Sequence, residues 1–143
     1  MYCALDIARY IICYAYEKGV TITNLKLQKL LYYAQAWYLV NFGTTLFEDK
    51  IEAWQFGPVV PNVYNEFKNF GRNPIELPED ECTNIISDEN CINYLDEFCE
   101  HFMKYSATDL VSMTHNEEPW KMAYLSDNKE IKPDVMKEYY SKL

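Results

Sequence analysis

The sequence contains few of the residues from which catalytic and metal sites are usually built. It has only two histidines, His101 and His115, so a centre with several histidine ligands is excluded unless many carboxylates join it. Its four glycines form no phosphate-binding loop, and the chain has no G-x-S-x-G turn. We therefore expect no cofactor, no metal and no enzymatic activity.

The cysteines do not supply a metal site either. Cys3, Cys13, Cys82, Cys91 and Cys99 are an odd number and lack the paired spacing of zinc ligands. Cys91 and Cys99 fall on one face of a predicted helix, where reduced thiols pack as small apolar groups. The opening MYCALDIARYII has a charge inside its apolar stretch and no basic start, unlike a secretory leader. We expect a cytoplasmic protein with reduced cysteines.

Positive charge is also scarce in this chain. Thirteen basic residues oppose 22 acidic ones, which gives a net charge of −9. A nucleic-acid-binding surface needs clustered Lys and Arg, so no nucleic-acid partner is expected unless Lys26 and Lys29 belong to a local basic strip. The acidic field permits a basic protein partner without requiring one, because opposite fields speed encounter.

The sequence does contain one long helical run, NLKLQKLLYYAQAWYLVN, from Asn24 to Asn41. Its apolar residues occupy nearly every face, and a helix of that kind is surrounded by protein. Two lysines and two glutamines interrupt the run, which makes it too polar to span a membrane. The run therefore predicts a buried central helix, with no membrane partner.

Shorter elements are predicted around this helix. The stretch TTLFEDKIEAWQF forms two short extended runs around residues 48–50, a β-hairpin or an extended arm, and Gly57-Pro58 ends the second run. Residues 72–87 hold two prolines and four acids and are predicted to be a mobile surface loop that tolerates deletion. Apolar spacing, caps and prolines predict further helices at 4–18, after Pro61, after Ser87, at 107–113, at 119–126 and after Pro133.

The length of 143 residues is typical of one domain. We find no repeat, low-complexity tract or linker that would divide the chain. The expected fold is mainly α: a compact, single-domain helical bundle over residues 1–143, built around a buried central helix, with a small β-hairpin or extended insertion.

The segment THNEEPW contains the one arrangement that suggests acid–base chemistry. His115 stands beside Glu117 and Glu118, so a carboxylate–imidazole pair is one interpretation. In the other, which we favour, Thr114 and His115 end one helix and hydrogen-bond the start of the next, where Glu118 and Pro119 favour helix entry.

Four polar residues of the central helix also need an explanation. Gln28 and Gln35 are seven residues apart and share one stripe, and a buried amide must find hydrogen-bond partners. We favour a clasp onto the hairpin backbone over a ligand site. Lys26 and Lys29 oppose the helix dipole, and they are either solvated there or paired with an acidic cluster, internal or on a partner.

Two tryptophans are placed where they can hold elements together. Trp54 and Trp120 each stand close to a proline that can begin a helix. We expect each side chain to fix the approach of two elements. If they are partly exposed, they are natural hot spots for binding a partner.

The segments LKLQKLLYYAQAWYLV, IEAWQFGPVVPNVYNEFKNFG and THNEEPW together resemble the Panacea antitoxin domain family, which includes the SocA-like proteolytic adaptor. The resemblance spans roughly Thr21 to Ala123, and the chain resembles the stand-alone form of the domain. It implies an antitoxin that neutralises a cognate bacterial or prophage toxin, encoded by an adjacent gene, through direct protein–protein binding. An alternative is a proteolytic adaptor that delivers a toxin to an AAA+ protease. A small enzyme using His115 is a less favoured alternative.

The resemblance also sorts the motif residues into two groups. A scaffold that serves many toxins should vary its contacts, so we expect most shared positions to be structural. The structural positions are Leu27, Gln28, Leu31, Tyr32, Trp37, Gly57, Pro58, Val59, Tyr64 and Pro119. The candidates for partner binding are Lys26, Lys29, Tyr33, Trp54, Phe56, His115, Glu117, Glu118 and Trp120. Neither the toxin nor an oligomeric state is predicted.

Overall fold

The computed structural model describes residues 2–143, and over this range it contains seven α-helices, two short 3₁₀ helices and one two-stranded antiparallel sheet. In chain order the elements are α1 (Ala4–Glu17), α2 (Asn24–Phe42), β1 (Glu52–Trp54), β2 (Gly57–Val59), α3 (Pro61–Phe67), η1 (Lys68–Phe70), η2 (Glu79–Cys82), α4 (Glu89–Phe102), α5 (Ala107–His115), α6 (Glu118–Tyr124) and α7 (Pro133–Ser141). The prediction of a mainly α fold with a small hairpin is confirmed.

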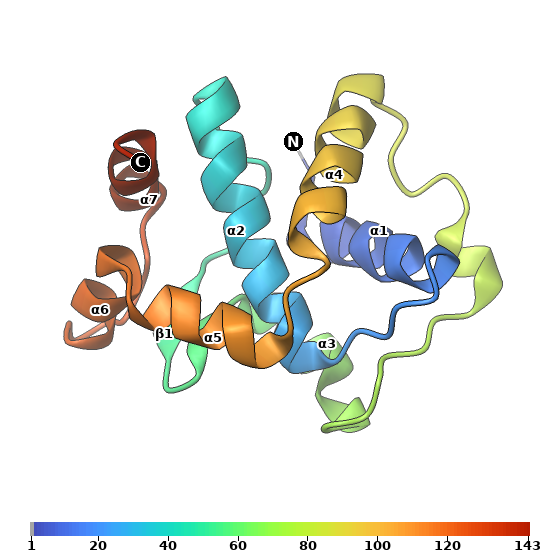
Figure 1. Cartoon of the computed structure of the whole chain (residues 1–143), viewed down its shortest axis with the longest axis horizontal. Coiled ribbons are helices and arrows are strands. Elements are labelled where there is room, and N and C mark those ends of the chain that lie inside the picture. Colours follow the sequence, from blue (N-terminus) through green and yellow to red (C-terminus); the bar gives the residue numbers. More distant parts are fainter. Residues whose placement is uncertain (1) are drawn as a thin grey trace.

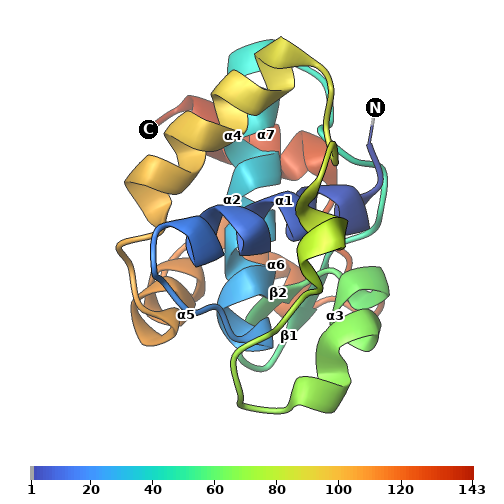
Figure 2. The same ribbon diagram turned by 90° about the vertical axis from the view of Figure 1, so that its right-hand side faces the viewer.

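Helix α2 is the axis of the molecule, and the other elements pack around it (Figures 1 and 2). Thr23 caps its first turn by accepting a hydrogen bond from the Lys26 N–H (3.3 Å), and Gly43 ends it in the left-handed conformation. Every residue from 26 to 36 is buried, which confirms the prediction of a helix surrounded by protein. Within the described residues no helix, α2 included, has the length and apolar character needed to cross a membrane.

The β-hairpin lies further along the chain than the sequence pattern predicts. Glu52–Trp54 pairs with Gly57–Val59, so the turn is not at residues 48–50, and Gly57-Pro58 begins a strand rather than ending one. Proline is tolerated here because Ala53 and Pro58 are a non-hydrogen-bonded pair: the Ala53 N–H points away from Pro58 to the Lys129 carbonyl (2.7 Å), and the Pro58 carbonyl points to Lys29. The missing N–H of Pro58 therefore costs no ladder hydrogen bond.

Side-chain caps and prolines set most of the remaining helix starts. Ser106 and Asp109 form the predicted capping box of α5, with hydrogen bonds of 3.0 and 3.1 Å in opposite directions. Pro61 and Pro133 occupy the first turns of α3 and α7. Helix α4 is capped by Asp88, one residue beyond the predicted Ser87.

Residues 72–87 form an exposed segment that runs beside α1 and is fixed to it and its neighbours (Figure 2). The Ile75 N–H donates to the Ile22 carbonyl (2.8 Å), and the Ile75 and Ile86 side chains are buried. Cys82 is disulfide-bonded to Cys13 of α1. These anchors fix the segment that was predicted to be a mobile loop, and its tolerance of deletion stays a prediction.

The same disulfide corrects the expectation that all five thiols are reduced. Packing of residues 72–87 against α1 brings Cys13 and Cys82 together, with their Cα atoms 5.7 Å apart. Sequence spacing did not predict this contact, because the two cysteines are 69 residues apart. Cys91 and Cys99 are free and buried on α4, where burial raises the pKa of their thiols to about 11 and about 12.

We expect Cys82→Ser to lower the free energy of unfolding by about 2–4 kcal/mol, because losing the cross-link restores conformational entropy to the unfolded chain. Urea denaturation under non-reducing conditions measures this change. Cys3→Ser is the matched control, since Cys3 is a free, exposed thiol. Equal denaturation midpoints for the two variants would contradict a stabilising cross-link.

Candidate functional site

The hairpin, α2 and α5 meet at a single crowded point beneath Gly57. Lys29 donates a hydrogen bond from Nζ to the Pro58 carbonyl (3.1 Å), which the hairpin ladder leaves free. A Cβ on Gly57 would lie 2.6 Å from the Lys29 Cε and 3.0 Å from the Thr114 Oγ1. With its φ of +111° as well, this position accepts only glycine.

Both lysines of α2 are buried, so the expectation that they are solvated or ion-paired is wrong. Lys29 is 0% exposed, and desolvation lowers its pKa to about 7. Lys26 is 9% exposed and donates to the Met103 carbonyl (2.8 Å), and burial lowers its pKa too. Backbone carbonyls, rather than carboxylates, accept the hydrogen bonds from both Nζ atoms because the chain folds α2 into its centre.

The two glutamines of α2 clasp backbone, as favoured above. The Gln28 Oε1 accepts from the Val60 N–H (2.8 Å), just beyond the hairpin. The Gln35 side chain accepts from the Leu46 N–H and donates to the Phe47 carbonyl, both at 2.7 Å. These bonds satisfy buried amides and fix the strand-like segments that flank the hairpin.

The helix turn between α5 and α6 carries a stack of aromatic rings. The His115 ring stacks on Trp120 with centroids 4.1 Å apart, and Trp120 stacks on Tyr124 at 4.7 Å. The Trp120 indole donates to the Trp54 carbonyl (2.9 Å), which ties α6 to the hairpin as predicted for these tryptophans. Lys129 places its Nζ over the Tyr124 ring, 4.5 Å from the centroid.

His115 is not joined to a carboxylate in this arrangement. Its Nε2 is buried and makes no hydrogen bond with any residue in the described part of the chain. Thr114 donates back to the Val111 carbonyl (2.9 Å), within its own helix. The Thr114 carbonyl accepts a hydrogen bond from the N–H of Glu117, the cap residue of α6 (3.1 Å), so the predicted bond from Thr114 to the start of α6 is present. The His115 ring is held by stacking on Trp120.

Glu117 accepts two phenol hydrogen bonds in a buried cluster. Tyr33 of α2 and Tyr140 of α7 donate to its Oε1 at 2.6 and 2.7 Å, and Tyr32 lies 2.9 Å from the Tyr140 hydroxyl. Desolvation raises the pKa of Glu117, while the two phenols oppose that rise. Burial also raises the pKa of all three tyrosines, so they stay protonated donors. The cluster links α2, α6 and α7.

The nine partner-binding candidates divide by exposure. Lys26, Lys29 and Tyr33 are buried and hold the interior together, so we remove them from the contact surface. Phe56, 61% exposed, and Glu118 face solvent, while the rest are half-buried: Trp54, His115, Glu117 and Trp120. None of the ten positions expected to be structural is exposed.

Sequence reasoning missed residues that extend the surface formed by the exposed and half-buried candidates. Tyr124 and Lys129 continue the ring stack, and Met122 and Leu125 are 65% and 86% exposed on and after α6. The spacing of four between Trp120 and Tyr124 was a usable signal for the stack. We call Trp54, Phe56, Glu118, Trp120 and Tyr124 together the hairpin–α6 corner.

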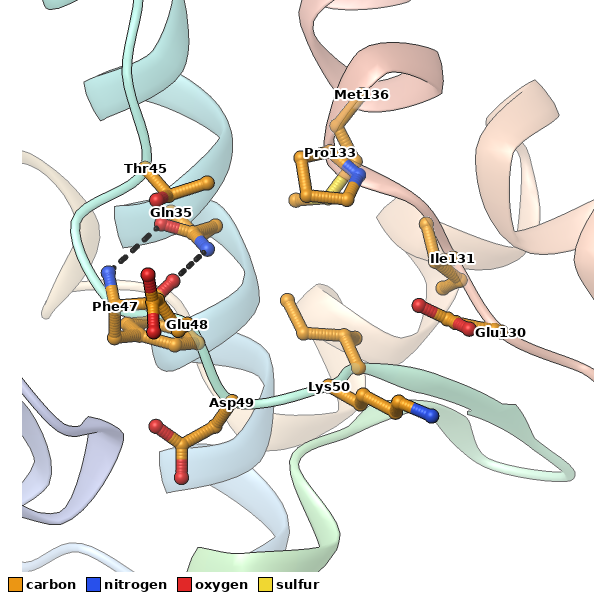
Figure 3. Close-up of a pocket in the computed structure, with 11 residues that line it drawn as sticks. Gln35, Thr45, Phe47, Glu48, Asp49, Lys50, Glu130, Ile131, Pro133 and Met136 are labelled. Atoms are coloured by element: carbon orange, nitrogen blue, oxygen red, sulfur yellow. Dashed lines mark hydrogen bonds between the residues drawn. The ribbon is translucent and has the colours of Figure 1, made fainter.

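A cleft of about 380 Å³ lies on another side, between the segment before the hairpin and the start of α7 (Figure 3). Four charged residues line this cleft: Glu48, Asp49, Lys50 and Glu130. The Asp49 carboxylate points away from Glu130 (Figure 3). Asp49 accepts hydrogen bonds from the Ala4 N–H and the Asn62 side chain, both at 2.9 Å. Nowhere in residues 2–143 do three or more His, Cys, Asp or Glu side chains form a group able to hold a metal ion.

Comparison with known proteins gives a family match over this same core. The family model described as "Antitoxin SocA-like, Panacea domain" matches residues 27–121, which contain most of α2, the hairpin and the α5–α6 turn. The curated antitoxin SocA of Caulobacter vibrioides is 43% identical over 68 residues, 48% of this chain and 36% of that protein. The match thus spans little more than a third of that relative's length. No solved structure matches the chain.

Proposed function

The chain belongs to the SocA-like, Panacea domain family of antitoxins, and on that membership we propose that it neutralises a cognate protein toxin by binding it directly. In this proposal residues 1–143 act as one domain, and the role is non-catalytic. The support for a non-catalytic role is the position of His115, whose ring is stacked and bonded to neither Glu117 nor Glu118.

We propose the hairpin–α6 corner as the toxin-contacting surface. The observation that carries this choice is the exposure of Phe56 beside half-buried Trp54 and Trp120. Aromatic rings held by rigid neighbours offer large contact area at little entropic cost, and Trp and Tyr are enriched among interface hot spots. The Trp120–Trp54 hydrogen bond and the ring stack supply that rigidity before any partner arrives.

Co-expression with the product of the adjacent gene tests the function. If that product is the toxin, it should arrest growth alone, and the chain should restore growth and co-purify with it as a stable complex. A non-toxic neighbour that also fails to bind would contradict the proposal. Toxin half-life, measured with and without the chain and the AAA+ protease, separates the mechanisms: an unchanged half-life with restored growth supports sequestration, whereas a shortened one supports proteolytic delivery.

We expect Phe56→Ala to weaken the toxin complex about tenfold or more, as truncating an interface hot spot does. Its exposure of 61% means that the change leaves the core intact. Phe42→Ala is the matched control, because Phe42 is 52% exposed and is the last residue of α2. The hairpin packs near the other end of that helix (Figure 1). Titration calorimetry on both variants measures the affinities. Equal affinities would place the contact surface away from the hairpin.

A further inference from the structure

A second surface feature lies outside the hairpin–α6 corner. A groove of about 610 Å³ runs between the C-terminal half of α1 and residues 74–82, the segment that crosses α1 in Figure 2. Its apolar lining includes Ile12, Val20 and Leu77, and Tyr16 stands at its edge, 76% exposed. The Cys13–Cys82 bond forms part of its wall and holds the two sides together. We call it the acidic groove.

The charges that line the acidic groove are all negative. Glu17, Glu76 and Glu79 are exposed carboxylates, and no Lys or Arg is among the described residues that line it. One side of the groove belongs to a longer acidic run, because residues 73–103 contain nine acidic residues and no Lys or Arg, whereas on the α1 side the exposed Lys18 follows Glu17. The thirteen acids elsewhere are matched by thirteen basic residues, so this region carries the entire net charge of −9.

Another groove provides a useful contrast. Between α6 and α7 a groove of about 530 Å³ is lined by both signs of charge, with Glu118, Glu130 and Glu138 opposed by Lys132 and Lys142. Lys142 and Glu138 are already paired at 3.4 Å. The lysines of that groove offset most of its negative charge, whereas the acidic groove has no lysine or arginine in its lining and therefore repels nucleic acid and anionic lipid and attracts cationic groups.

We propose that the acidic groove binds a basic amphipathic segment of a protein partner. The apolar face of the segment fills the space lined by Ile12, Val20 and Leu77, and its Lys or Arg side chains meet Glu17, Glu76 and Glu79. An amphipathic helix with anchors at i, i+3 and i+4 fits such a groove. The inference rests on the proposed function only in taking this partner to be the toxin.

A designed peptide tests the chemistry of the groove directly. The probe is a fluorescein-labelled helix of about 16 residues with leucines on one face and lysines on the other. Its controls are a scrambled peptide of the same composition and a twin with Glu in place of Lys. Fluorescence anisotropy should show that the protein binds the probe and neither control peptide. On binding, amide chemical shifts should change along residues 12–22 and 74–82.

Two charge-matched triple variants make the test specific. Glu17→Gln, Glu76→Gln and Glu79→Gln together should weaken probe binding tenfold or more. Glu89→Gln, Glu97→Gln and Glu100→Gln, which remove the same charge from exposed positions of α4 outside the groove, should change it less than threefold. Equal weakening by both sets would overturn the proposal, because binding would then follow the long-range field alone. Absent binding, or shifts confined to the α6–α7 groove, would overturn it as well.

The toxin complex separates this proposal from the proposed function. If the toxin binds and the groove triple variant weakens the complex, both stand. If the toxin binds equally to both triple variants, its docking segment lies elsewhere and the inference fails, while the antitoxin role stands. If no toxin binds, the antitoxin role fails, and the peptide experiment decides the groove by itself. Self-association that the groove variant abolishes would identify a second copy as the occupant and overturn the proposal.

Discussion

Replacing Gly57 by alanine should destabilise the protein more than any other single methyl addition we consider, by about 2–6 kcal/mol. Two independent costs combine. The φ of +111° is a conformation that L residues rarely adopt. The added Cβ would also lie 2.6 Å from the Lys29 Cε, so a buried side chain or the whole hairpin must move. Urea denaturation of Gly57→Ala against the wild type measures the sum.

Two further variants separate these costs. Gly19→Ala also adds a methyl at positive φ (+72°), but nothing lies within 4 Å of the new atom, so it reports a backbone cost alone. In the background of Lys29→Ala, Gly57→Ala should cost less than it does in the wild type, because the clashing alkyl chain is gone. If Gly57→Ala is no more destabilising than Gly19→Ala, the close packing beneath the hairpin does not contribute to the free energy of unfolding.

This crowded point also explains what the sequence could and could not predict. The burial of α2 followed from periodicity, because apolar residues on all its faces leave no face for water. The Gly57-Pro58 pair was misassigned as a strand end, since those residues usually interrupt strands. Proline is harmless there because the hairpin register makes Ala53 and Pro58 a non-hydrogen-bonded pair, in which the Ala53 N–H points outward to Lys129. The position of the hairpin therefore depended on a partner 76 residues further along the chain.

The candidate site, like the hairpin, could be predicted from the sequence only where it did not depend on a distant backbone contact. Trp54 and Trp120 were recognised as connectors from their neighbouring prolines, and the structure joins them by one hydrogen bond. Lys29 was expected in solvent or in an ion pair, because a lysine is rarely buried without an acid partner. Its actual acceptor is the Pro58 carbonyl, which is free only because the hairpin register leaves it free. A backbone carbonyl that becomes a free acceptor only through strand pairing cannot be predicted from the types of residues in the sequence.

The buried Lys29 amine should make the stability of the protein rise with pH above neutrality. Burial lowers its pKa to about 7 in the folded chain, against 10.5 for an unperturbed lysine. Between these values the unfolded chain carries a proton on Lys29 that the folded chain has lost, so lowering the pH favours unfolding. The slope is about 1.4 kcal/mol per pH unit once the folded amine is neutral, or roughly 4–5 kcal/mol over the whole interval.

Lys29→Met isolates this effect, because methionine is also unbranched, is only one atom shorter than lysine, and removes the titrating group. From pH 7 to 8.5 the wild type should gain roughly 1.5 kcal/mol of stability relative to the variant, measured by urea denaturation at each pH. Above that window the raised pKa values of Cys91 and Cys99 act in the opposite direction, since unfolded thiols lose protons that the folded ones keep. Both proteins contain those thiols, so the difference between them cancels this term.

An exposed lysine provides the control for charge alone. Lys121→Met removes a cation from the solvent-facing side of α6 and should leave the pH dependence of the wild type unchanged. Parallel stability curves for Lys29→Met and the wild type would mean that the buried amine is already charged in the folded protein. The Pro58 carbonyl would then be holding an ammonium ion without a carboxylate nearby, and the hairpin would be fixed by a charged hydrogen bond rather than by the neutral amine that we expect above pH 7.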